Sequence, residues 1–305
     1  MKKISVLMFT FCITAVMSFG IVDTGFEVLD SLGVDSPFRD IIIDGRGGCS
    51  ITAQGIVKVP IIFVDREFLP GNTSPDNVQS NYWPLGGDPQ YMCDFINSSL
   101  PPQGYQWPRM NLTKYLHVMS NGLFNYIGDT YRYTIPAGVT FTNTGQLSSH
   151  VLTQMDPLID YAQYDHWKTN TSYDHDYYEY PSTDADRYVD WVFIVYRFRL
   201  SDMFPSINYT GYTPIPEYTS QDMILGQPVK IGGWGRGSAQ GGMRESGFNG
   251  ISHVCLHELA HALFPYGHNG RLAGLSVLSA NQVGWGTSIW GMQCMGEGEA
   301  SLDEL

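Results

Sequence analysis

Residues 251–264 read ISHVCLHELAHALF and carry the strongest helix signal in the chain. Apolar side chains fall on nearly every face of a helix drawn through them, which is typical of a helix enclosed by the rest of the protein. Two histidines and a glutamate would be costly to bury there unless they bind something. The stretch therefore predicts a buried helix that carries a binding site.

His257, Glu258 and His261 form an H-E-x-x-H motif within this helix. Residues four apart lie on one helix face, so both imidazoles can ligate one cation. Zn²⁺ with three protein ligands keeps a fourth position open for a water molecule, whose pKa the metal lowers. Glu258 is then the expected general base, which passes the proton to a leaving amine. The simpler alternative is a buried helix whose histidines are only hydrogen-bonded.

A third zinc ligand has to come from outside the motif. Pro265 ends the helix and Gly267 permits a sharp turn, which would bring His268 back towards the metal. His268 is therefore the expected third ligand. The sequence leaves other candidates open, and these are His253, Glu297 and Glu299.

Further segments resemble the secreted metzincin-type metallopeptidases related to the immune-inhibitor-A group. The similar stretches are 57–65, YLHVMSNGLFNYIGDTYRYTIP (115–136), DPLIDYAQYD (156–165), VDWVFIVYR (189–197) and GISHVCLHELAHALF (250–264). The family pattern places its third ligand ten residues after the first histidine, where this chain has Gly267. His268, one residue further on, takes that role in the resemblance.

The resemblance implies an α/β (α+β) metzincin-like zinc peptidase domain. It would have a twisted mixed sheet, an active-site helix and a small C-terminal subdomain. In such peptidases a turn that contains methionine packs below the metal, and Met292 or Met295 would fill that place here, or be ordinary core residues. The implied activity is that of a secreted zinc metalloendopeptidase, which hydrolyses peptide bonds with a metal-bound water.

Patterning elsewhere predicts the framework of the domain. Apolar β-rich runs predict strands at 57–64 and 189–196. Helices are expected at 111–119, with Asn111 as the cap, and at 148–161. Two strands are expected at 124–127 and 131–135, separated by Gly128-Asp129. The region 201–250 is expected to be a long loop. Its glycine-rich part, 226–250, is either flexible or offers backbone edges to an extended peptide.

The domain boundaries follow from composition. Residues 1–20 have a short positive start and an apolar run, which predicts a signal peptide and an extracellular location. Residues 21–55 are expected to be a lead-in segment or short propeptide, 56–296 the catalytic domain and 297–305 an acidic tail. After signal cleavage we expect no membrane association.

Charge and composition limit the partners. Lys and Arg total 17 against 30 Asp and Glu, which gives a net charge of −13. That balance excludes a general nucleic-acid binder, which needs a basic surface. Protein or peptide substrates and a monomeric state are expected.

Two other features remain open at this point. Four cysteines follow the signal segment, an even number that permits two disulfides, and these are Cys49, Cys93, Cys255 and Cys294. Cys49 could alternatively act as a propeptide thiol that blocks the zinc, although a disulfide is favoured. Eight aspartates between 156 and 190 form either a solvated acidic loop or a Ca²⁺ site.

Two rival functions are compatible with the same sequence. One is a non-catalytic exported binding or adhesion domain with a degenerate zinc motif. The other is a zinc hydrolase of a non-peptide amide or ester. The intact Glu258 favours an enzyme over the binding domain, and casein digestion would separate the peptidase from the other hydrolase.

Overall fold

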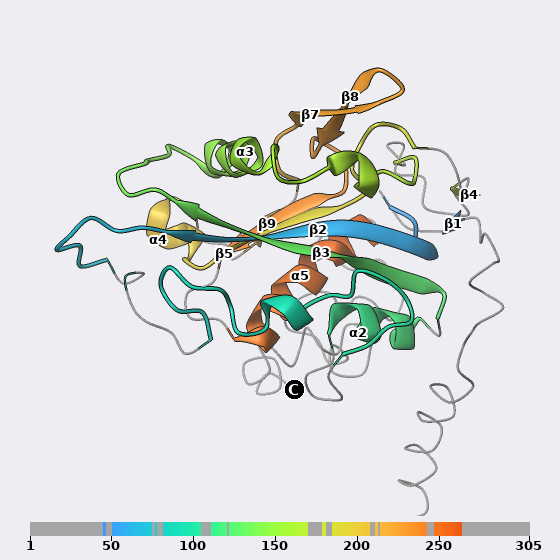
Figure 1. The fold of residues 1–305 in the computed structure, drawn as a ribbon, viewed down its shortest axis with the longest axis horizontal. Helices are drawn as coiled ribbons and strands as arrows, with labels where there is room; N and C mark the ends of the chain where they lie inside the picture. The colour runs from blue at the N-terminus through green and yellow to red at the C-terminus, as the bar shows by residue number, and fades with distance from the viewer. Residues whose placement is uncertain are drawn as a thin grey trace, which may run out of the picture. The chain divides into compact units, whose positions relative to one another are not determined.

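The computed structural model of the chain describes much of the sequence between residues 45 and 263 (Figure 1). The described residues are 45–46, 51–74, 77, 82–104, 111–120, 122–169, 179–180, 185–207, 211–212, 214–242 and 247–263. The chain divides into two compact units, residues 1–43 and 44–305, and every described residue belongs to the second. The predicted signal peptide (1–20), His268, Met292, Met295 and the acidic tail (297–305) lie outside the described residues.

A mixed sheet of five strands lies at the centre of the described part of the chain (Figure 1). Its strands, in spatial order, are β3 (Phe124–Ile135), β2 (Gly55–Arg66), β5 (Val192–Tyr196), β9 (Ser238–Gly242) and β6 (Gly211–Tyr212). The first four strands run parallel, and β6 pairs with β9 in the antiparallel direction. The predicted mixed α/β architecture is confirmed at this level.

The sheet is covered on both faces, and strand β2 shows why. Val57, Val59, Ile61 and Phe63 belong to a hydrophobic cluster with helix α5, here called the α5-side core. Ile62 and Val64 point to the opposite face. Because both faces of a parallel sheet are buried, its strands are nearly continuous apolar runs, and this is the pattern that revealed β2 in the sequence.

Helices α2 (Leu112–Met119) and α5 (Phe248–Leu263) pack on the α5-side core, and α3 (Thr144–Met155) covers the other face of the sheet (Figure 1). The predicted cap of α2 is confirmed, since the Asn111 side chain accepts the Lys114 N–H at 2.9 Å. Short helical segments are α4 (Leu200–Met203), η2 (Met92–Asp94) and η3 (Tyr161–Tyr164). None of the helices in the described residues is long and apolar enough to cross a membrane.

Helix α3 differs from the prediction at both ends. It begins at Thr144, because the Asn143 side chain caps it by accepting the Gln146 N–H at 2.9 Å. It ends at Met155, two residues before Pro157, whose nitrogen has no N–H to continue the helical hydrogen bonds. The predicted range, 148–161, therefore lay too far towards the C-terminus.

The predicted separation of two strands at Gly128-Asp129 is wrong. Residues 124–135 form one continuous strand that runs parallel to β2 over its whole length. A Cβ on Gly128 would overlap the carbonyl oxygen of Val59, so glycine here permits a close approach of the two backbones. Glycine was taken as a turn signal, whereas the sheet uses its small size.

The prediction of a long loop over 201–250 is also wrong. This region contains β6, β9 and the hairpin of β7 (Tyr218–Ile224) with β8 (Gln227–Ile231). The hairpin turns at Leu225 and Gly226, whose φ angles of 51° and 76° are both positive, as in a tight two-residue turn. A further short pair joins β1 (Gly45–Arg46) to β4 (Glu179–Tyr180).

Candidate catalytic and metal site on helix α5

Helix α5 carries the motif and is anchored beneath the sheet at its first residue. The ring of Phe248 packs edge-on against Tyr91 at 5.8 Å and Phe95 at 5.6 Å between centroids. Phe95 in turn packs at 5.4 Å against Phe63 of β2. These aromatic contacts fix the start of α5 against the central strand, so the predicted buried helix at 251–264 is confirmed with an earlier start.

Glu258 is the most buried polar group of the motif that the structure describes. Only 5% of its surface is exposed. Among the described residues its carboxylate has no hydrogen-bond partner. Burial raises the pKa of the carboxyl group to about 8, because desolvation penalises the charged form. A nearby cation would favour the charged form instead.

Gly211 of the edge strand β6 lies against this carboxylate. A Cβ built on Gly211 would overlap Oε1 of Glu258 and come within 2.7 Å of its Cδ. Sequence reasoning missed this neighbour, since Gly211 stood in a region that was expected to be loop. No local pattern connects the two residues, which lie far apart in the chain.

The two motif histidines occupy positions four residues apart on the observed helix, so both fall on one face. His257 is half-buried. The side chain of His261 is outside the described part of the structure, as is that of the alternative ligand His253. His268, Glu297 and Glu299 lie beyond the last described residue, so the identity of the third ligand stays a prediction.

Among the described residues there is no group of three histidine, cysteine, aspartate or glutamate side chains that could hold a metal ion. Of the predicted zinc site, the structure describes only the side chains of His257 and Glu258. The zinc site therefore remains a prediction. What the structure adds to it is the helix, its support and the surroundings of Glu258.

The two described cysteines are free thiols. Cys93 is exposed on η2, and Cys255 is buried on α5. Two disulfides would use all four cysteines, including these two. The arrangement that the even count permits is therefore wrong. Burial raises the pKa of the Cys255 thiol. A buried thiol of this kind is chemically inert.

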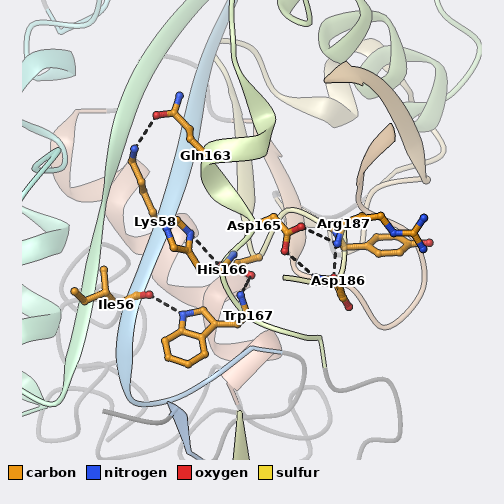
Figure 2. Close-up of polar contacts among 10 residues, drawn as sticks. Ile56, Lys58, Gln163, Asp165, His166, Trp167, Asp186 and Arg187 are labelled. Atoms are coloured by element: carbon orange, nitrogen blue, oxygen red, sulfur yellow. Dashed lines mark hydrogen bonds and ion pairs between the residues drawn. The ribbon is translucent and has the colours of Figure 1, made fainter. Parts of the chain in front are cut away.

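The aspartate-rich segment forms a network that sequence reasoning did not resolve (Figure 2). Asp165 accepts the N–H groups of Asp186 at 3.2 Å and Arg187 at 2.7 Å. Asp190 accepts those of His166 at 3.1 Å and Trp167 at 2.9 Å. These carboxylates therefore hold the two loop segments together through backbone N–H groups.

Burial sets the ionisation of this network. It raises the pKa of Asp165 to about 7, with the neighbouring Asp186 adding to the rise. Burial likewise raises the pKa of Asp190, which is fully enclosed. The alternative of a calcium site stays open, since Asp174, Asp176 and Asp184 lie outside the described residues.

Comparison with known proteins gives no relative from which a function could be transferred. No protein-family model matches the chain, and the search of curated proteins found no match. The functional argument therefore rests on the motif and on the geometry around it.

Proposed function

We propose that this chain is a secreted zinc-dependent endopeptidase of the metzincin type, with His257, His261 and His268 as metal ligands and Glu258 as general base. The observation that supports it most is the setting of Glu258. It lies at the centre of an H-E-x-x-H motif, on a helix held beneath the sheet, beside the edge strand β6.

The described residues fit a zinc site in three respects. Imidazole nitrogens are preferred zinc ligands, and the motif supplies two at helical spacing. Glu258 is a buried carboxylate without a hydrogen-bond partner in the described part of the chain, and such a group is costly unless a cation or a polar ligand compensates it. That carboxylate lies against Gly211 of β6, in the position that a side chain at 211 would take.

When bound, Zn²⁺ would lower the pKa of a water molecule and polarise the scissile carbonyl. The carboxylate of Glu258 takes the proton from the attacking water and delivers it to the leaving amine. Burial of Glu258 between α5 and β6 keeps this proton transfer away from bulk solvent.

Strand β6 offers a way to hold the substrate. It is the last strand in the order of the sheet and pairs with β9 through Gly211 and Tyr212. An extended peptide that adds to the outer edge of a strand gains main-chain hydrogen bonds. A peptide bound there would pass close to Glu258, which lies against Gly211.

The test measures zinc content and casein hydrolysis by the purified protein, with and without a chelator. We expect one bound zinc and cleavage that the chelator abolishes. Glu258→Ala should lose about 10³-fold or more in kcat with its zinc retained, because the general base acts only on the reaction. Glu67→Ala, a change at an exposed glutamate outside the site, is the matched control and should keep activity.

Two outcomes would redirect the proposal. A protein that binds zinc and cleaves neither casein nor other proteins would be a hydrolase of a non-peptide amide or ester. A protein that binds no zinc would be a non-catalytic domain with a degenerate motif.

A further inference from the structure

Gly211 has no conformational need to be glycine. It is not among the described glycines with a positive φ, so a residue with a side chain could adopt its backbone conformation. The atoms around Gly211 give a different reason for a glycine at this position. A Cβ at this position would overlap Oε1 of Glu258, and it would also crowd the Cδ at 2.7 Å and the Cγ at 3.1 Å.

The three nearest atoms around that Cβ position all belong to the Glu258 side chain. Backbone atoms of β9 are not among them, although Gly211 pairs with Gly241 in the sheet. A methyl group at 211 would therefore displace the flexible glutamate before it moved the strand. The missing side chain of Gly211 thus shapes the space that the Glu258 carboxylate occupies.

We propose that Gly211 is a positioning residue for the general base. Because glycine has no side chain, the Glu258 carboxylate can occupy the position from which it acts. This inference rests on the proposed peptidase function. A displacement of a reacting group by about 1 Å can reduce a rate by ~10²-fold. Gly211→Ala should therefore reduce kcat by about 10²-fold.

The experiment compares Gly211→Ala with wild type in kcat, KM, zinc content and thermal unfolding midpoint. We expect kcat to fall while KM and zinc content stay near their wild-type values, because a methyl group removes neither main-chain donors and acceptors of β6 nor any ligand. The control is Gly247→Ala, just before α5. Its added Cβ would meet only the Tyr82 ring at 3.7 Å, an ordinary contact, so activity should persist.

A second readout does not depend on activity. If the methyl group acts through the carboxylate, Gly211→Ala lowers the unfolding midpoint in the wild-type background and has a much smaller effect in a Glu258→Ala background. An equal drop in both backgrounds would overturn the proposal.

The kinetic outcomes also separate the inference from the function on which it rests. Active wild type with an equally active Gly211→Ala variant overturns the inference alone. A variant that loses zinc together with kcat, or that changes only KM, shows a structural or substrate-binding role and overturns it too. A wild-type protein that cleaves no peptide bond overturns both proposals.

Discussion

The buried aspartate network should make the stability of the protein depend on pH in a defined direction. Asp165 has a pKa of about 7 in the folded protein, against an ordinary value of 3.8, mainly through burial. Since the folded pKa is the higher one, ionisation is harder in the folded state than in the unfolded chain. The stabilisation that this group provides is complete below pH ~4 and is lost as pH rises towards 7.

The shift corresponds to at most ~4 kcal/mol, and screening by solvent should leave about 2 kcal/mol. Replacing the ionisable group by Asp165→Asn removes this dependence, although it also costs one backbone acceptor at every pH. The free energy of unfolding of the variant, relative to wild type, should therefore rise by ~2 kcal/mol between pH 4 and pH 8.

Urea unfolding of both proteins at several pH values measures this difference directly. Loss of the Asp165 charge also removes one cause of the raised pKa of Asp190, which changes the difference in the same direction. Asp202→Asn, at an exposed position, is the control variant. A constant difference for Asp165→Asn across the range would refute the reasoning.

Two further changes test the fold. Leu225→Asn should stabilise the protein by ~0.5–1 kcal/mol, because Leu225 is 98% exposed with φ of 51°, a conformation that asparagine tolerates better before Gly226. A lower melting temperature in the variant would contradict this. Phe95→Ala should cost ~3–5 kcal/mol in urea unfolding, since the fully buried ring contacts Phe63 and Phe248. A loss no larger than that of Leu158→Ala, at an exposed leucine, would show that the aromatic contacts do not anchor α5.

Several elements could be read from the sequence because their causes are local. The cap of α2 depends on Asn111 and a backbone N–H three residues later. Strand β2 was visible because both of its faces are apolar. Helix α5 was visible because nearly all of its faces are apolar, and its motif histidines follow from helical spacing alone.

The predictions failed where the structural role of a residue depends on a neighbour that is far away in the chain. Gly128 looked like a turn, but it allows β3 to approach Val59 of β2. The region 201–250 was predicted to be loop because it is rich in glycine. Its strand β9 forms because it pairs with β5 and β6. Asp165 and Asp190 looked like solvated acids, yet backbone N–H groups of other loop residues enclose them.

The sequence by itself determined the helix and the motif within it, because helical spacing and apolar periodicity are properties of consecutive residues. Only the tertiary structure placed Gly211 against Glu258, and only it buried that carboxylate at the edge of the sheet. Contacts between segments far apart in the chain depend on how the strands are ordered and which faces they bury. That order is fixed by the packing of the whole core, and no local pattern records it.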